Sequence, residues 1–265
     1  MTLIAGVAGQ PVAHSLSPLI HKAWIAAAGL DADYLAYAPA DEAGFAELVA
    51  QARAGRLRGL NVTAPFKAAA LALADEASAT ARRCGSANLL VMDDGSVTAD
   101  STDGAGLMAA LEEQAPGLSV GGRPVLILGA GGAARAAAAA LKAAGADVAV
   151  LNRTVARAEE MAADLGVRVA GPDAVAGAAL VVNAISAAQE IAINALRDDA
   201  VLMDMTYRPL LTPFLAAGRA RGLTTVDGLA MLIGQARPSF RALFGMEPPP
   251  VDVRALALTA LGETP

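Results

Sequence analysis

The sequence predicts an α/β protein of two domains, and its 265 residues are enough for two domains of ordinary size. In the second half, short apolar segments alternate with longer segments of helical periodicity. We expect strands there at residues 125–128, 148–151, 180–183, 201–205 and 224–226. This alternation is typical of a parallel sheet with helices on both faces. The apolar fraction of 55% is rich in alanine and aromatic residues make up only 3%, so we expect helices packed closely on small side chains.

The first half has strand signals at a different spacing. We expect strands at residues 3–8, 34–37, 57–63, 87–92 and 97–99. The sequence Asp93-Asp94-Gly95 predicts a tight turn that joins the last two as a hairpin. Ser17 is expected to be the N-cap of a helix, with Pro18 in its first turn and Gly29 at its end. Further helices are expected to begin at Pro65 and to cover residues 103–113 and 228–244.

Composition excludes several classes of function. The chain has 20 basic and 26 acidic residues, a net charge of −6, and therefore no basic footprint for nucleic acid. Cys84 is the only cysteine, which rules out an internal disulfide and fits a reducing cytoplasm. His14 and His21 are the only histidines, and no cysteine–histidine spacing predicts a zinc site. We find no secretory signal and no apolar run long enough to span a membrane. We expect a cytoplasmic protein that binds a small molecule and needs no metal.

A glycine-rich segment opens the alternating half. Residues 129–134, Gly-Ala-Gly-Gly-Ala-Ala, fit the pattern Gly-x-Gly-x-x-Ala directly after a strand and before an alanine-rich helix. Such glycines let the backbone turn tightly and approach a pyrophosphate, whose charge suits the helix N-terminus. Close packing of helix on strand would explain the glycines equally well. The second strand, however, ends about twenty residues later, at Asn152, where a residue that binds the ribose of the cofactor is expected. We therefore predict a Rossmann-type dinucleotide domain.

The residues at that corner favour NADP over NAD. No carboxylate stands there to bind a free ribose 2′-hydroxyl, and the sequence is instead Asn152-Arg153-Thr154, with Arg157 in the next helix. Guanidinium groups present forked donors that suit a 2′-phosphate. The alternative is that both arginines are ordinary surface charges. The position at the end of the second strand favours the phosphate-binding interpretation, more for Arg153 than for Arg157.

A second polar segment lies in the first half, at Gly59–Lys67, which reads Gly-Leu-Asn-Val-Thr-Ala-Pro-Phe-Lys. Asn61, Thr63 and Lys67 cluster there where a strand passes into a helix. A lysine is disfavoured in a first helical turn because the unpaired N–H groups already make that end positive. Such a junction commonly binds a polar ligand, although a solvated lysine beside a turn accounts for the pattern equally well.

The chain as a whole resembles the shikimate dehydrogenase family. The resemblance rests on ordered blocks from about residue 6 to residue 245: Gly9–Pro18, Gly59–Lys67, Ser101–Gly104, Gly129–Ala134 and Gly228–Gln235. It implies an N-terminal substrate domain, residues 1–101 with residues 228–265 returning to it. Residues 102–227 would form the NADP-binding domain, with a cleft between the two. The implied activity is reversible, NADP-dependent reduction of 3-dehydroshikimate to shikimate, a step of chorismate and aromatic amino acid biosynthesis. A monomer or a homodimer is expected.

The resemblance also implies a role for individual residues. Ser15 and Ser17 would hold the substrate carboxylate, assisted by Thr63 and Tyr207. Ring hydroxyls would be bound by Asn61, Asn88, Asp103 and Gln235. Lys67 and Asp103 match the catalytic pair, the alternative being a structural ion pair. Cofactor contacts are implied for Gly129, Ala130, Gly131, Gly132, Ala133, Asn152, Arg153, Thr154, Arg157, Ile185, Met205, Gly228 and Met231. We interpret Asp100 and Asp204 as turn or strand-end residues.

Several positions depart from the family pattern. Ser101 stands where asparagine normally precedes Thr-Asp-Gly, and Leu89 stands where threonine normally follows Asn88. In residues 183–188, Ile185 replaces a common threonine and the following glycine is missing. These changes leave two alternatives open. One is a quinate/shikimate or aminoshikimate dehydrogenase. The other is a catalytically weak paralogue that binds shikimate or nucleotide as a sensor.

Overall fold

The computed structural model describes residues 2–185 and 191–264 and divides into two compact units. The first unit contains residues Met1–Thr102 and Gln235–Pro265, and the second contains Asp103–Gly234. Both are built from strands and helices, as the sequence predicts. The second unit ends at Gly234, seven residues after the expected end at residue 227. The reason lies in helix α9 (Gly228–Phe244), because its first residues still pack within the second unit. A Cβ atom on Gly234 would lie 3.0 Å from Gly106 O.

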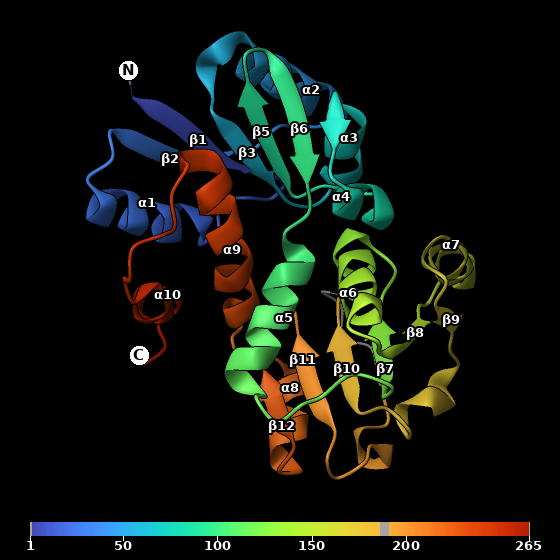
Figure 1. Cartoon of the computed structure of the whole chain (residues 1–265). Coiled ribbons are helices and arrows are strands. Elements are labelled where there is room, and N and C mark those ends of the chain that lie inside the picture. The colour runs from blue at the N-terminus through green and yellow to red at the C-terminus, as the bar shows by residue number, and fades with distance from the viewer. Residues whose placement is uncertain (1, 186–190, 265) are drawn as a thin grey trace. The chain divides into compact units, whose positions relative to one another are not determined.

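The first unit contains a six-stranded mixed sheet in the order β2-β1-β3-β5-β6-β4 (Figure 1). Its strands are β1 (Leu3–Ala8), β2 (Ala32–Tyr37), β3 (Gly59–Val62), β4 (Glu76–Ala77), β5 (Leu89–Asp93) and β6 (Ser96–Asp100). β1 pairs in parallel with β2 and β3, whereas β5 is antiparallel to β3 and β6. The β5–β6 hairpin turns at Asp94 and Gly95, both with positive φ (47° and 81°), as expected from the Asp-Asp-Gly sequence.

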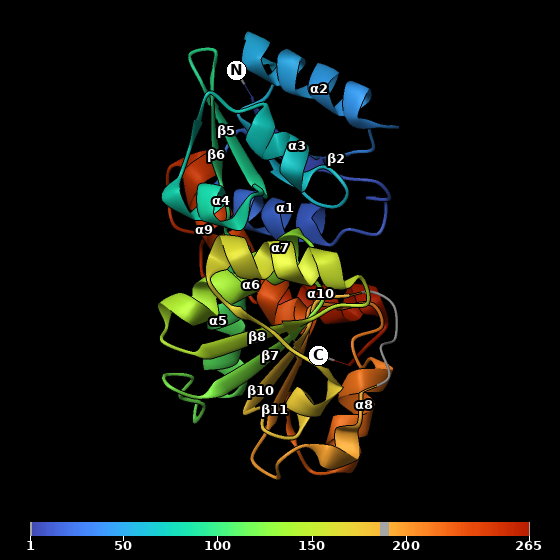
Figure 2. The same cartoon turned by 90° about the vertical axis from the view of Figure 1, so that its right-hand side faces the viewer.

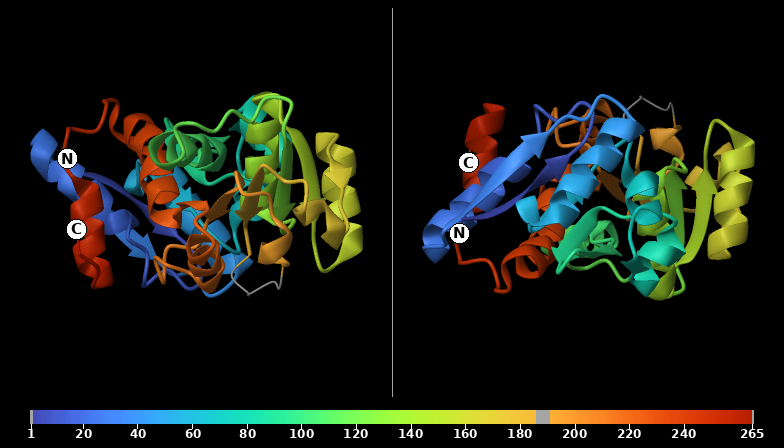
Figure 3. Two further views of the ribbon diagram at one scale, coloured as in Figure 1. Left: turned by 90° about the horizontal axis from the view of Figure 1, so that it is seen from below. Right: turned by 90° about the horizontal axis from the view of Figure 1, so that it is seen from above.

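Helices cover both faces of this sheet. They are α1 (Ser17–Ala28), α2 (Glu42–Gln51), α3 (Lys67–Ala72), α4 (Ala79–Cys84), the end of α9, α10 (Val253–Leu261) and the π-helical turn η1 (Ala52–Arg56). Successive residues of a strand point to opposite faces. Leu60 therefore packs into the core with Phe45 of α2 and Phe66 beside α3. Figure 2 shows α2 and α3 on one side of this sheet. A Cβ atom on Gly59 would lie 2.3 Å from Leu243 of α9, on the other face. α1 and α10 lie side by side (Figure 3).

Two predicted helix starts in this unit are wrong. The N-cap of α1 is Leu16, not Ser17, which is already helical and whose N–H donates to Ser15 Oγ at 3.2 Å. Helix α3 begins at Lys67, not at Pro65. Pro65 belongs to a turn, because the Phe66 N–H donates to the Thr63 carbonyl at 3.0 Å. Lys67 nevertheless lies in the first turn, as expected.

The second unit contains a six-stranded, wholly parallel sheet in the order β12-β11-β10-β7-β8-β9. The strands are β7 (Pro124–Leu128), β8 (Asp147–Leu151), β9 (Arg168–Val169), β10 (Leu180–Asn183), β11 (Val201–Asp204) and β12 (Thr224–Val226). The helices are α5 (Asp103–Gln114), α6 (Gly132–Ala143), α7 (Val155–Leu165), α8 (Pro213–Ala220), the start of α9 and the short η2 (Pro172–Val175) and η3 (Ile193–Ala195). The strand order reverses at β7, since β8 lies on one side of it and β10 on the other. In open α/β sheets, ligands bind at the carboxyl ends of the strands at such a switch point.

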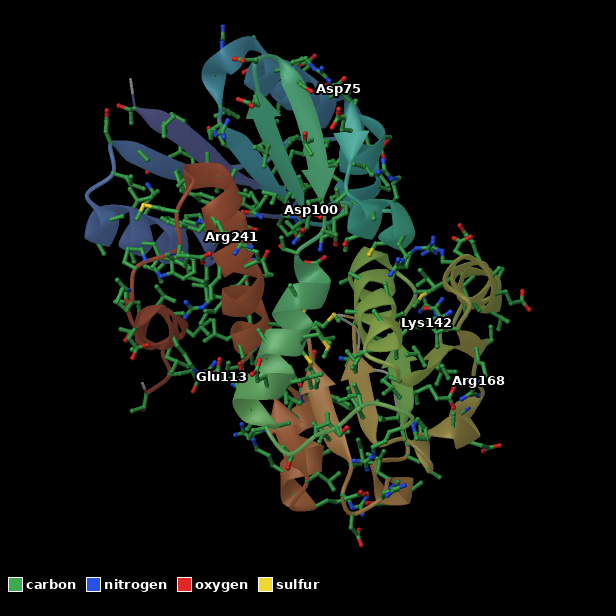
Figure 4. The ribbon with its side chains drawn as sticks, in the orientation of Figure 1. Asp75, Asp100, Glu113, Lys142, Arg168 and Arg241 are labelled. Carbon is green, nitrogen blue, oxygen red and sulfur yellow. The ribbon has the colours of Figure 1, made fainter. Side chains whose placement is uncertain are left out.

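The helices of this unit pack closely, as the alanine-rich composition predicts. A Cβ atom on Gly104 would lie 2.9 Å from Ala140, so α5 approaches α6 closely (Figure 1). α8 packs on the opposite face, where Leu215 joins a core with Leu126 and Leu202. Lys142 of α6, marked in Figure 4, donates to the last carbonyls of α7, Leu165 O at 2.6 Å and Gly166 O at 2.7 Å. Such contacts satisfy carbonyls that a helix end leaves unpaired.

Candidate active site

The candidate substrate residues of the first unit follow the carboxyl ends of two neighbouring strands. β1 and β3 pair in parallel, and beyond them the Thr63 N–H donates to Ala8 O at 2.9 Å. The chain segments that lead to Ser15 and to Lys67 therefore start side by side. A Cβ atom on Gly9 would lie 2.2 Å from Thr63 Cγ2, so only glycine at this position allows the close approach.

Ser15 and Ser17 lie at the start of α1. Ser15 Oγ accepts the Ser17 N–H, and Ser17 is 5% exposed. Among the residues that the structure describes, the Ser17 hydroxyl has no hydrogen-bond partner, and α1 has no acidic residue in its first turn. A carboxylate could therefore accept hydrogen bonds here in place of a capping side chain.

A buried amide network joins Asn88 to α9. Asn88 Oδ1 accepts the Thr102 N–H at 2.7 Å, and the direction is fixed because a backbone N–H can only donate. Asn88 Nδ2 then donates to Gln235 Oε1 at 3.1 Å and to Thr102 Oγ1 at 2.9 Å. Asn88 and Gln235 are 3% and 8% exposed. Two amides from distant parts of the sequence are thus held in defined orientations, which is what recognition of a hydroxylated ring requires.

Asn61 belongs to the same network. Its Nδ2 donates to Asn88 O at 3.2 Å and to Ser239 Oγ at 2.9 Å, and its Oδ1 accepts from Tyr34. Sequence analysis missed Tyr34 and Ser239, and it assigned no role to Thr102. The only signal available was the spacing of Gln235 and Ser239, four residues apart on one helix, which places them on one face.

The two candidate catalytic residues belong to different units. Lys67 is half-buried at the start of α3, and its carbonyl accepts the Ala87 N–H at 2.9 Å, next to Asn88. Asp103 is 7% exposed and begins α5. It directly follows Thr102, whose backbone is fixed by Asn88. Within the first unit, Lys67 is thus tied to the segment that leads to Asn88.

The glycine-rich loop follows β7 at the switch point of the second sheet. Gly129 has φ of 113°, which favours glycine, and a Cβ atom there would lie 2.7 Å from Ile185 Cγ2. Gly131 is the N-cap of α6 and is exposed, with no atom within 4 Å of where its Cβ would lie. The loop from Gly129 to Ala133 thus leaves open space before the positive end of a helix, as a pyrophosphate site requires.

The expected ribose corner follows β8, the neighbour of β7. Asn152 Nδ2 donates to Thr154 O at 2.9 Å and closes the turn before α7. Thr154 is the N-cap of α7, but its hydroxyl accepts no capping hydrogen bond. Arg153 and Arg157 are exposed, and in the described parts of the chain neither guanidinium has an ion pair or a hydrogen bond. The corner therefore offers two unpaired cations and an unused hydroxyl.

The remaining candidate residues lie at the carboxyl ends of β10 and β11 and at the start of α9. The Met205 N–H donates to Asn183 O at 2.9 Å, and a Cβ atom on Gly228 would lie 2.5 Å from Met205 O. Asp227 Oδ1 accepts the Ala230 N–H and caps α9. Met205 and Tyr207 are half-buried and Met231 is buried.

A cavity of about 500 Å³ opens beside these strand ends in the second unit. Its polar wall contains Asn183 and Asp204, which are joined by a hydrogen bond of 3.0 Å. Asp204 also accepts from Thr212 Oγ1 at 2.7 Å. Asp100 and Asp204 each end a strand, as expected, and Asp100 is marked in Figure 4. The cavity borders Ile185, whereas the expected Ser186–Ala188 segment lies outside the described residues.

Of the residues expected to act together, the structure places Ser15, Ser17, Asn61, Thr63, Lys67, Asn88 and Gln235 in the first unit. Asp103, Tyr207 and all the expected cofactor residues belong to the second. Within residues 2–185 and 191–264, no group of three His, Cys, Asp or Glu side chains could hold a metal ion. No helix of the same residues is long and apolar enough to cross a membrane.

Comparison with known proteins gives a consistent result. Residues 7–90 match the family model of the shikimate dehydrogenase substrate binding domain, and residues 110–202 match that of shikimate / quinate 5-dehydrogenase. A shikimate dehydrogenase (NADP(+)) of Caulobacter vibrioides is 52% identical over 98% of this chain and 96% of its own length. The structure of shikimate 5-dehydrogenase from Thermus thermophilus in complex with NADP(H) and shikimate is also similar. It has a TM-score of 0.87 and 37% identity, covering 94% of this chain and 95% of that one. Quinate dehydrogenase from Corynebacterium glutamicum in complex with NAD has a TM-score of 0.86 and 31% identity, covering 98% and 99%.

Proposed function

The chain belongs to the shikimate dehydrogenase family, and we propose that it catalyses the reversible, NADP-dependent reduction of 3-dehydroshikimate to shikimate. This reaction is a step of aromatic amino acid biosynthesis, and we place it in the cytoplasm, which suits a chain with a single cysteine. The observation that supports it best is the buried network of Asn61, Asn88 and Gln235. Its amides are aligned by the fold in a part of the chain that also carries Lys67.

The chemical step needs a group that exchanges a proton with the substrate oxygen. NADP supplies the hydride acceptor when it is bound. As hydride leaves the carbon of shikimate, the hydroxyl on that carbon must lose its proton, and Lys67 or Asp103 receives it. Lys67 lies in the first turn of α3. The carboxylate of Asp103 orients the same hydroxyl.

We assign the substrate carboxylate to the start of α1. Ser15 and Ser17 would donate to it from their hydroxyls, with Thr63 and Tyr207 assisting. Asn61, Asn88, Asp103 and Gln235 would bind the ring hydroxyls. The support for this assignment is that Ser17 is only 5% exposed and that, among the described residues, its hydroxyl has no protein hydrogen-bond partner.

Removing both hydroxyls, as Ser15→Ala with Ser17→Ala, should raise KM for shikimate by about tenfold or more and change kcat less. Loss of two hydrogen bonds to a charged group, at about 1.5–3 kcal/mol each, is sufficient for this. Loss of the Ser15 hydrogen bond to the Ser17 N–H should also cost about 1 kcal/mol of stability, so thermal unfolding is measured in parallel. Unchanged KM in a folded double variant would place the carboxylate elsewhere.

We assign the 2′-phosphate of NADP to Arg153, with Arg157 and the Thr154 hydroxyl beside it. The pyrophosphate would lie on the loop from Gly129 to Ala133 and the N-terminus of α6. The support is that both guanidinium groups are exposed and, in the described parts of the chain, unpaired. By contrast, most arginines of the second unit are paired with carboxylates. The nicotinamide end would lie near Ile185, Met205, Gly228 and Met231.

Arg153→Ala should raise KM for NADP at least about tenfold and leave KM for NAD nearly unchanged, because NAD has no 2′-phosphate. Arg168→Ala is the matched control, since Arg168 is an exposed arginine of the same unit whose partner is Asp147 at 2.7 Å. Initial rates with both cofactors provide the measurement. Equal weakening of both cofactors would mean that Arg153 supports the loop and does not read the phosphate.

The function itself is tested by initial rates with shikimate and quinate, each with NADP and NAD. We expect shikimate with NADP to give the highest kcat/KM. Quinate is included because Leu89, which stands where the family usually has threonine, is paired with Asn61 across β3 and β5. Paired residues place their side chains on the same face of a sheet. Higher kcat/KM with quinate would replace the proposed substrate, and no turnover of either would favour a sensor.

A further inference from the structure

Tyr34 of β2 lies in an aromatic cluster of the first unit. Its side chain is 0% exposed and stacks on His21 of α1, with ring centroids 4.1 Å apart and an interplanar angle of 5°. Phe240 of α9 lies on His21 as well, at 5.9 Å, and contacts Trp24 at 5.5 Å. The ring of Tyr34 is thus fixed by packing, so its hydroxyl occupies one position.

That hydroxyl is 2.8 Å from Asn61 Oδ1, and the direction of the hydrogen bond can be derived. One side of the Asn61 amide faces Asn88 O at 3.2 Å, and a carbonyl oxygen can only accept. The group on that side must therefore be Nδ2, which leaves Oδ1 toward Tyr34. Burial raises the pKa of the Tyr34 hydroxyl well above its usual value, so the hydroxyl keeps its proton and donates it.

The arrangement determines what Asn61 can offer to a ligand. Its two N–H groups are used by Asn88 O and by Ser239 Oγ, and one lone pair of Oδ1 is used by Tyr34. The Ser239 hydroxyl cannot easily become the donor to Asn61, because it already donates to Gln235 O at 3.0 Å. Among the residues that the structure describes, none donates to the second lone pair of Oδ1. Asn61 is therefore set to accept a hydrogen bond from a hydroxyl, not to donate one.

We propose that Tyr34 is a positioning residue: through its hydroxyl it holds Asn61 Oδ1 in place to accept a hydrogen bond from a ring hydroxyl of the substrate. This rests on the proposed function, in which the ring is that of shikimate. Tyr34 does not touch the substrate in this scheme. It fixes the amide that does.

The test replaces one hydroxyl at a time on a single strand. Tyr34→Phe removes the hydrogen bond and keeps the stacked ring. Tyr37→Phe is the matched control, because Tyr37 lies three residues further along β2 and, in the described residues, its hydroxyl makes no hydrogen bond. We expect Tyr34→Phe to raise KM for shikimate about three- to tenfold, with kcat changed less than about threefold and KM for NADP unchanged. Tyr37→Phe should change none of these.

A double-mutant cycle separates positioning from a general packing effect. If Tyr34 acts through Asn61, Tyr34→Phe should change KM by less than about twofold in an Asn61→Ala background. The same rise in KM in both backgrounds would overturn the proposal. So would an unchanged KM in Tyr34→Phe when the wild-type enzyme turns over shikimate normally.

A second measurement does not depend on the substrate. In a ¹⁵N-labelled sample, the side-chain amide signals of Asn61 are identified by their loss in Asn61→Ala. Tyr34→Phe should shift or broaden them, whereas Tyr37→Phe should not. Signals that Tyr34→Phe leaves unmoved overturn the proposal even if the wild-type enzyme proves to act on another ring. Shifted signals in an enzyme inactive on shikimate would uphold the positioning of Asn61 and refute only the proposed substrate.

Discussion

Lys67→Ala should lower kcat for shikimate oxidation by roughly 10²–10⁴-fold, the usual range for a group that transfers a proton in the reaction. KM for shikimate should change much less, because the groups assigned to the carboxylate and ring hydroxyls remain. Lys67 belongs to the short helix α3, and its carbonyl is tied to the Ala87 N–H. Removing the side chain leaves that backbone contact in place.

The chain offers a good control, since it has only three lysines, Lys22, Lys67 and Lys142. Lys22 forms an exposed ion pair with Asp33 at 2.9 Å, a contact typically worth no more than about 1 kcal/mol. Lys22→Ala should therefore keep wild-type kcat. If Lys67→Ala also retained most of its kcat, Lys67 would not carry the proton, and Asp103 would be left as the candidate.

Much of the fold could be predicted from local pattern. The bounds of β1, β10, β12 and α9 coincide with those expected. The clearest signals are those of β1, a continuous apolar segment that ends before Gly9, and of α9, a long periodic segment that begins at Gly228. The starts of α1 and α3 could not be predicted. At both, a residue with a strong local preference, Ser17 or Pro65, lies in a turn or helix whose start depends on hydrogen bonds of neighbouring residues. Local preference is easily overridden by such contacts.

The residues of the candidate site also differ in whether the sequence could indicate them. Asn61, Asn88 and Gln235 belong to recognisable motifs, so the sequence alone indicates them. Tyr34 and Ser239 belong to none. Their contacts with Asn61 join residues 27 and 178 positions apart. Such contacts arise only when β2, β3 and α9 come together, which no single sequence reveals.

The aromatic cluster around Tyr34 should also make the first unit sensitive to acid. His21 is 0% exposed, and among the described residues neither of its ring nitrogens has a hydrogen-bond partner. Its neighbours are the rings of Trp24, Tyr34 and Phe240. The Arg237 guanidinium lies over the Trp24 ring, 5.9 Å from its centroid. Burial lowers the pKa of His21 to about 3, because the charged form would lose its water without gaining a partner.

The sign of the pH effect follows from the two pKa values. A histidine side chain in the unfolded protein has a pKa of about 6.5. Between pH 6.5 and 3 the unfolded state therefore binds more protons than the folded one. The contribution of the uncharged His21 side chain to the free energy of unfolding is fully present above pH 6.5. It is lost as the pH falls, at about 1.4 kcal/mol per pH unit. From about pH 6.5 to pH 5 the first unit should thus lose roughly 2 kcal/mol of unfolding free energy through this one residue.

His21→Phe should abolish that loss, since phenylalanine keeps a ring against Tyr34 and does not titrate. A slightly larger ring could cost about 1–3 kcal/mol by overpacking, but that cost does not vary with pH. Trp24, the only tryptophan, contacts His21, so its fluorescence during urea unfolding reports on this unit. The control is His14→Gln at the other histidine, which is exposed and should lose stability toward pH 5 as the wild type does. All three proteins contain the same carboxyl groups, so the difference between wild type and His21→Phe isolates His21. If that difference stays constant from pH 7 to pH 5, the buried imidazole is not what makes the first unit acid-sensitive.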